Sequence, residues 1–175
     1  MSPGRAGVAG LLALAVAACG TPRPQRVVIG VGLTENTNGG LKLAVAEMNR
    51  SGGIGGVRIE FAGLDATSAS TPYDPKAILG QAAHFKAIPD LIAVVGHNDS
   101  ASTLSAAPSY NQAGIPQIVT IATSPVITNI GPWTYRLCLS DAFQGPLLAE
   151  YAVSTWGKTR IALFYVNDDY GRGLT

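Results

Sequence analysis

The fold is decided by residues 91–103, LIAVVGHNDSAST. The first six of these residues form an uncharged run rich in valine and isoleucine, which predicts a strand buried on both faces of a sheet. The polar residues that follow lead into a helical pattern that ends at Gly114, with a kink expected at Pro108. A buried strand that passes through a polar loop into a helix is the repeating unit of an α/β fold.

The same alternation of apolar runs and helical stretches continues along the rest of the chain. Strands are expected at Val27–Leu33, Val57–Leu64, Leu91–Gly96, Gln117–Ile121 and Arg160–Val166. Helices are expected at Gly40–Arg50, from Asp74-Pro75 onward, at Ser100–Ala113 and at Asp141–Trp156. This rhythm predicts βαβ units, so we expect a parallel, Rossmann-like sheet covered by helices on both faces.

Composition narrows the possible functions. Only 13% of the 175 residues are charged, against about 25% in typical soluble domains, and the net charge is +1 without any basic run. Nucleic acid is therefore not an expected partner. The two histidines lie far from the two cysteines, so the pattern predicts neither a metal site nor a cofactor. Cys138 is expected to be a lone, buried thiol.

The amino terminus has the pattern of an export signal. Arg5 precedes an apolar run, Ala6–Ala18, that is too short to span a bilayer but has the length of a signal-peptide core. The run ends in Val16-Ala17-Ala18-Cys19-Gly20, which resembles a bacterial lipobox. We therefore predict a lipoprotein signal peptide at residues 1–18, lipidation of Cys19 and a Pro-rich tether at residues 19–26. The alternative is an ordinary secretory leader in which the cysteine is incidental.

Three polar segments leave predicted strands, at residues 96–103, 121–125 and 167–171. Ligands of open parallel sheets bind at the carboxyl ends of the strands. The first segment enters a helix, whose free amide hydrogens and positive dipole end suit a carboxylate. The second adds hydroxyl groups and the third adds an aromatic side chain. The simpler alternative is that these polar residues only cap helices.

Several motifs resemble one known family in their order and spacing. They are Val28–Gly30, Leu43–Asn49, Gly52–Ile54, Gly96–Thr103, Ala113–Pro116, Ala122–Pro125 and Gln144–Pro146. Together they resemble the leucine/isoleucine/valine-binding protein family, solute receptors of ABC importers with the type 1 periplasmic-binding fold. The resemblance implies a first ligand-binding lobe at residues 27–139 and the start of a second lobe at residues 140–175. The chain would cross between the lobes after a strand near Tyr135–Leu139, so the hinge would lie near Leu139–Asp141.

The resemblance also implies roles for particular residues. Ser100 matches the serine that takes the ligand carboxylate, and Thr123 matches the threonine that binds the amino-acid backbone, so both are expected to hold the carboxylate. Ile121 and Ala122 would contribute main-chain groups, and Tyr170 would close onto the ligand from the second lobe. The implied protein is not an enzyme. It would be an extracytoplasmic lipoprotein, anchored to the cell membrane at the bacterial surface or in the periplasm, that delivers a branched-chain or related small amino acid to an ABC permease.

The chain departs from the family pattern in two places. The loop Leu33–Gly39 is short, which removes part of one wall of the cleft. The chain also ends at Thr175, about halfway through a family member, so the acidic residue that pairs with the ligand ammonium in the second lobe has no counterpart. We therefore expect the chain alone to bind weakly, near the millimolar range, as a fragment or as one partner of a larger assembly.

Other readings of the sequence remain open. A sensor with the same fold would contact a signalling protein instead of a permease. A nicotinamide-dependent enzyme is suggested by Gly30-Val31-Gly32 and Asp65, although the third glycine of that fingerprint is missing. A hydrolase would have to use His97, Asp99 and Ser100, which lie too close together in one loop to align as nucleophile, base and orienting residue. Asp99 is instead expected to be an N-cap, and Asp168 and Asp169 are expected to be loop caps.

Overall fold

A computed structural model describes residues 26–63 and 74–175. The predicted signal peptide, Cys19 and Asp65 lie outside these ranges. Within them, no helix combines the length and the apolar character needed to cross a membrane.

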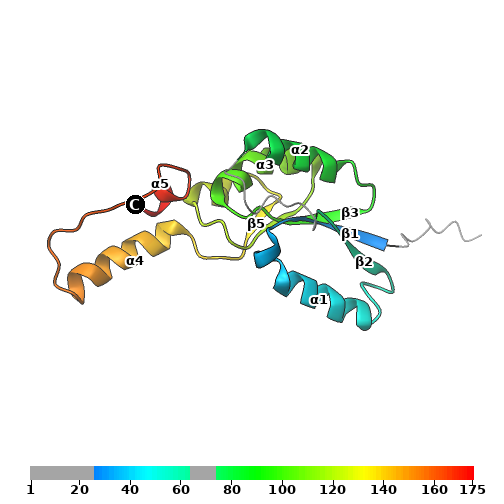
Figure 1. Ribbon diagram of the computed structural model, residues 1–175, viewed down its shortest axis with the longest axis horizontal. Helices are drawn as coiled ribbons and strands as arrows, with labels where there is room; N and C mark the ends of the chain where they lie inside the picture. Colours follow the sequence, from blue (N-terminus) through cyan, green and yellow to red (C-terminus); the bar gives the residue numbers. More distant parts are fainter. Residues whose placement is uncertain (1–25, 64–73) are drawn as a thin grey trace, which may run out of the picture.

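A parallel five-stranded sheet forms the centre of the fold (Figure 1). The strands are β1 (Arg26–Gly32), β2 (Arg58–Ala62), β3 (Leu91–Gly96), β4 (Gln117–Val119) and β5 (Thr134–Arg136), in the order β2-β1-β3-β4-β5. All four neighbouring pairs are parallel. The strand order reverses beside β1, which makes the carboxyl end of β3 part of a topological switch point. The predicted α/β class and parallel sheet are confirmed.

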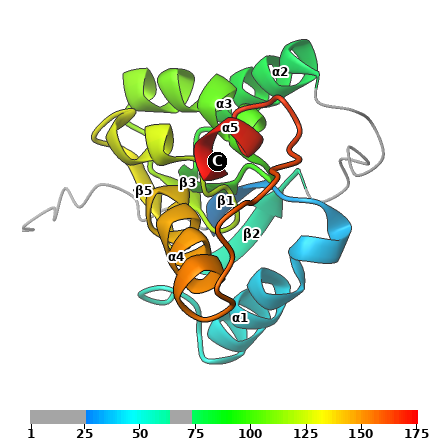
Figure 2. The same cartoon turned by 90° about the vertical axis from the view of Figure 1, so that its left-hand side faces the viewer.

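Helices cover both faces of the sheet (Figures 1 and 2). On one face lies α1 (Gly39–Arg50), and on the other lie α2 (Pro75–Lys86) and α3 (Ser100–Ala113). The remaining helices of the described ranges are the short 3-10 turns η1 (Glu35–Thr37) and η3 (Pro125–Asn129), then α4 (Asp141–Ser154) and α5 (Gly171–Leu174).

The ends of the helices follow local sequence signals. Asp74 caps α2 by accepting a hydrogen bond from the Lys76 amide at 2.9 Å, and Pro75 occupies the first turn. Gly114 ends α3 at φ 67°, a left-handed conformation that glycine adopts without steric cost. The helix continues through Pro108, where a kink was expected.

The main core lies between the sheet and the pair α2 and α3. Its fully buried members are Ala82, Phe85, Val94, Ala106 and Tyr110. A side chain at Gly30 would place its Cβ 3.0 Å from the Phe85 ring, and one at Gly32 would lie 2.7 Å from Nδ1 of His97. Both glycines are inside β1 and make room for rings packed against it. The G-x-G pattern therefore serves packing, not the phosphate-binding turn that a nicotinamide-dependent enzyme requires.

The predicted strand at Arg160–Val166 is wrong. This segment has no strand pairing with any described residue, and it returns beside α4 at a distance from the sheet (Figures 1 and 2). Its apolar side chains are exposed, with Phe164 at 96% and Val166 at 71%. A strand requires a neighbour with free backbone groups, and α4 offers none because its own groups are bonded within the helix.

Candidate functional site

A cavity of about 320 Å³ lies beyond the carboxyl ends of β3 and β4. Its lining residues are Asn98, Asp99, Ser100, Ile121, Ala122, Thr123, Asp168 and Tyr170. All five residues that were expected to contact a ligand, Ser100, Ile121, Ala122, Thr123 and Tyr170, are in this set. They come from three segments that are distant in sequence and that the fold brings together. Their contact with a ligand remains a prediction.

Ser100 begins α3 and supplies a hydroxyl group to the cavity wall. Asp99 before it is the N-cap, and its carboxylate accepts hydrogen bonds from the Ser102 amide at 2.8 Å and the Ser102 hydroxyl at 2.7 Å. Asp99 is thus held by the helix, as expected for a cap. The Ser100 hydroxyl accepts a hydrogen bond from the Ser124 amide at 3.3 Å. Its own proton has no acceptor among the described residues, so it is available to a ligand.

Thr123 is fixed by residues of β5 and of the first turn of α4. Its hydroxyl donates to Oδ2 of Asp141 at 2.9 Å, and the Asp141 amide donates to the Thr123 carbonyl at the same distance. The Arg136 guanidinium donates to the carbonyls of Thr123 at 3.2 Å and Ser124 at 2.9 Å. Because the Thr123 proton is engaged, the hydroxyl oxygen can only accept hydrogen bonds from a ligand. This arrangement suits an ammonium group better than the carboxylate that we expected Thr123 to hold.

His97 precedes the cavity residue Asn98 and is itself 1% exposed. Its ring stacks on Tyr110, with Nε2 3.1 Å from the tyrosine hydroxyl. Burial lowers the pKa of His97 to about 4 despite the opposing charge of Asp99, and burial raises the pKa of Tyr110. The histidine is neutral at physiological pH and its ring bonds to Tyr110 instead of Ser100. The described loop therefore does not assemble the nucleophile and base of a hydrolase.

Polar contacts hold the loop that carries Ser100. The Gln117 side-chain amide donates to the Gly96 carbonyl at 3.1 Å, and the Thr103 hydroxyl donates to the His97 carbonyl at 3.5 Å. Gln117, Thr103 and His97 are each at most 1% exposed. Since buried polar groups are costly unless they are paired, this layer favours one conformation of the loop.

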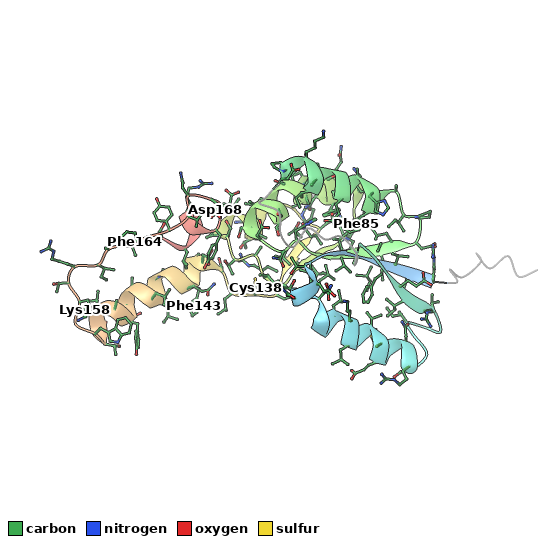
Figure 3. All side chains as sticks on the ribbon, viewed as in Figure 1. Phe85, Cys138, Phe143, Lys158, Phe164 and Asp168 are labelled. Atoms are coloured by element: carbon green, nitrogen blue, oxygen red, sulfur yellow. The ribbon has the colours of Figure 1, made fainter. Side chains whose placement is uncertain are left out.

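Asp168 and Tyr170 reach the cavity from the segment after α4. Asp168 accepts a hydrogen bond from the Gly171 amide at 2.7 Å, and the next carboxylate, Asp169, forms an ion pair with Arg172 at 2.8 Å. Asp168 thus caps the turn, as expected, whereas Asp169 pairs with a side chain and caps no described amide. The two acids have separate partners and do not form an acid/base pair. Asp168 lies just before α5, as Figure 3 shows. It also lines the cavity, which its local capping pattern did not indicate. Tyr170 is 47% exposed.

Cys138 departs from its expected place in the core. It lies on the connection after β5, it is only partly buried, and its thiol donates to the Ala122 carbonyl at 3.2 Å (Figure 3). Partial burial raises the pKa of the thiol. No group of three or more His, Cys, Asp or Glu residues is placed to hold a metal ion in the described ranges. Through its hydrogen bond, the Cys138 thiol supports the main chain of Ala122, which lines the cavity.

These features define an α/β protein with a polar, ligand-sized cavity at the carboxyl edge of a parallel sheet. A family model described as "Periplasmic binding protein" matches residues 33–175, and the chain belongs to this family. Membership implies a location outside the cytoplasm.

Three relatives show how far the similarity extends. The chain is 33% identical to an "Amino acid binding protein" of Pseudomonas aeruginosa and 31% identical to "Leu/Ile/Val-binding protein homolog 1" of Brucella abortus, with 94% of the chain and 46% of each relative covered. A branched-chain amino acid transporter substrate binding protein, LivJ of Streptococcus pneumoniae, was solved in complex with isoleucine. It superposes with a TM-score of 0.73 at 25% identity, covering 85% of this chain and 44% of that one. The chain spans about half the length of the curated relatives it matches.

Proposed function

We propose that the chain binds a small amino acid, of the branched-chain or a related kind, as the first lobe and hinge of an extracytoplasmic solute-binding protein that serves an ABC importer. The observation that carries the proposal is the convergence of three distant segments on one cavity of about 320 Å³. This volume is at the lower end of the range for small-molecule sites, which suits a compact solute. The amino-acid ligands named for the relatives support the same class of solute.

The cavity wall offers both hydrogen-bond donors and hydrogen-bond acceptors to a zwitterionic ligand. Ser100 has a hydroxyl proton to donate, and the amide hydrogens at the start of α3 carry the positive end of the helix dipole. These groups suit a carboxylate. Thr123 and Asp168 present oxygen acceptors, which suit an ammonium group. An α-amino acid carries both charges on neighbouring atoms and can use both sets.

Titration by NMR tests this function. The chain should bind leucine, isoleucine or valine with a Kd near the millimolar range, because it spans about half the length of its two-lobed relatives. Ser100→Ala should weaken binding roughly tenfold or more, since a hydrogen bond to a charged group contributes about 1.5 to 3 kcal/mol. Ser109→Ala changes the same residue type at the far end of α3, where its hydroxyl accepts a bond from Lys86, and serves as the control. Equal affinities of both variants would contradict the proposed pocket.

Membrane attachment through Cys19 is the second part of the proposal. The lipobox-like sequence before Cys19 supports it, because small residues precede the cysteine at the end of a signal-like run. Mass spectrometry of the membrane fraction should show a mature protein that begins with a diacylated Cys19. Cys19→Ala should abolish lipidation, whereas Cys138→Ala, which removes the chain's other cysteine, should leave it intact. Recovery of Cys19→Ala at the membrane with normal mature mass would exclude this anchor.

A further inference from the structure

Asn98 contributes a polar side chain to the cavity wall. It lies in the loop between β3 and α3, and it is half-buried. Its Oδ1 accepts a hydrogen bond from the hydroxyl of Thr37, in η1, at 2.9 Å. Because β3 lies between β1 and β4 in the sheet, this bond holds Asn98 on the side of β1, whereas Thr123 follows β4. Asn98 and Thr123 therefore border different parts of the cavity.

The bond to Thr37 determines which end of the Asn98 amide remains available. The Thr34 hydroxyl lies 2.9 Å from the Thr37 hydroxyl and can donate to it. The Thr37 hydroxyl also lies 3.1 Å from the Thr34 carbonyl, but Oδ1 of Asn98 is the nearer acceptor for its proton. With Oδ1 engaged, the amide nitrogen is the branch that points away from Thr37. Its two protons have no acceptor among the described residues, so Asn98 can donate hydrogen bonds to a solute.

The cavity wall has few groups that suit an apolar side chain. Most of its lining residues are polar or charged, namely Asn98, Asp99, Ser100, Thr123 and Asp168. Among the apolar ones, Ile121 and Ala122 are expected to act through their main chain, and Tyr170 is 47% exposed. A solute with an apolar side chain would cover the Asn98 amide without bonding to it, and an unpaired polar group weakens binding. A solute whose side chain carries an acceptor avoids this loss.

The charges on the cavity wall limit the kind of acceptor. Asp99 and Asp168 are carboxylates, and none of the described residues that line the cavity is basic. The carboxylate of Asp99 is bonded to Ser102, and that of Asp168 is bonded to the Gly171 amide. A second carboxylate on the solute would therefore meet like charges without a compensating cation. The oxygen of a carboxamide or hydroxyl group can accept a hydrogen bond without adding charge.

We propose that Asn98 is a specificity-determining residue and that the cavity prefers a small amino acid whose side chain carries an uncharged hydrogen-bond acceptor, such as a carboxamide. The inference rests on the proposed function, because it names the side chain of the solute that the same cavity takes. Leucine still binds through its ammonium and carboxylate groups, but more weakly. Thr37 is a positioning residue, since it holds the Asn98 amide with its nitrogen available.

Asparagine, leucine and aspartate provide the test, because their side chains are similar in size and branching but differ in polarity and charge. In NMR titrations, the unchanged chain should bind asparagine about fivefold or more tightly than leucine. This ratio is expected for one hydrogen bond that leucine cannot make and for the unpaired amide that leucine leaves. Aspartate should bind about tenfold more weakly than asparagine, because Asp99 and Asp168 repel its side chain.

Variants of the chain show whether Asn98 causes the preference. Asn98→Leu should reverse it, so that leucine binds more tightly than asparagine. Thr37→Val should reduce the ratio to about twofold or less, whereas Thr37→Ser, which retains the hydroxyl, should preserve it. Asn129→Leu makes the matched change at an exposed position of η3 outside the cavity and should leave the ratio unchanged. If Asn98→Leu does not fold, Asn98→Asp replaces it, since it keeps an oxygen for Thr37 and removes the amide donors. It should abolish the preference for asparagine.

The possible results separate this inference from the proposed function. If leucine binds the unchanged chain at least as tightly as asparagine, the assigned solute class is overturned and the proposed function stands. If the unchanged chain and Asn98→Leu prefer asparagine equally, Asn98 is not the selecting residue and the inference is again overturned. Aspartate binding as tight as that of asparagine would overturn the requirement for an uncharged acceptor. If the unchanged chain binds none of these amino acids, the proposed function fails and the selection by Asn98 fails with it.

Discussion

The described residues of the first region (26–63 and 74–139) and of the second region (141–175) differ sharply in burial, although both regions are rich in apolar side chains. In the first region Phe85 is fully buried beneath α2, whereas Phe143 on α4 is 56% exposed and Phe164 is 96% exposed (Figure 3). The buried residues of α4 and α5 are only Asp141 and Gly171. Apolar composition alone therefore does not produce a core. A core requires facing surfaces, which the sheet and its helices provide in the first region.

The second region exposes an apolar groove of about 570 Å³ between α4 and the extended segment before α5. Its walls include Leu148, Ile161, Leu163 and Val166. The folding free energy of the described chain is therefore expected to come from the first region. The second contributes its polar contacts at the cavity, through Asp141, Asp168 and Tyr170.

A pair of phenylalanine variants tests this contrast most strongly. Phe85→Ala should lower the free energy of unfolding by about 3 to 5 kcal/mol, because it removes a fully buried ring and leaves a cavity. Phe164→Ala should change it by less than about 0.5 kcal/mol, since the ring is exposed. Urea denaturation measures both. Similar losses for the two variants would show that the second region is packed in solution.

The pH dependence of stability tests the buried histidine of the first region. The pKa of His97 is about 4 in the folded state and its ordinary value is 6.5, so the unfolded chain takes up a proton more readily. Stability should therefore be intact above pH 6.5 and fall by about 3 kcal/mol as the pH drops toward 4. Denaturation of the unchanged chain and of His97→Gln across this range measures the effect.

The acid sensitivity of the unchanged chain should be lost in His97→Gln, because glutamine places no titrating group at this buried position. If the stability of His97→Gln fell as steeply with decreasing pH as that of the unchanged chain, other groups would cause the acid sensitivity.

Asn38 offers a smaller test within the same region. Its side chain is completely buried, and neither its Oδ1 nor its Nδ2 has a hydrogen-bond partner among the described residues. An unpaired buried amide costs about 1 to 3 kcal/mol, so Asn38→Leu, which is similar in size, should raise the stability by about 1 kcal/mol. Calorimetric melting of the two proteins checks this. A clear loss of stability would show that the amide is bonded in solution.

Local signals explain why much of the first region was predictable. Leu91–Gly96 and Ser100–Ala113 have the predicted bounds of a strand and a helix, because a buried apolar run, an Asp N-cap and a glycine C-cap mark their ends. The wrong strand at Arg160–Val166 has equally strong local features. Its structure depends on a neighbouring strand, which local sequence cannot supply.

The candidate site was predictable where it follows strand ends and not where it depends on distant contacts. Ser100 and Thr123 follow β3 and β4, which is where an open parallel sheet places ligands. Asp141 looks like an ordinary acid in the first turn of a helix, because its bond to Thr123 joins residues 18 positions apart. The same holds for Asp168, whose capping pattern is local and whose place on the cavity wall is not.

The central claim is that the carboxyl edge of the sheet, and not the apolar groove of the second region, receives the solute. Backbone amide NMR shifts during a leucine titration of the chain test it most directly. The account predicts saturable shifts concentrated at residues 98–102, 121–124 and 168–171, with those of Ser100 lost in Ser100→Ala. Shifts confined to α4 and residues 160–166, or no saturable shifts at the sheet edge, would contradict it.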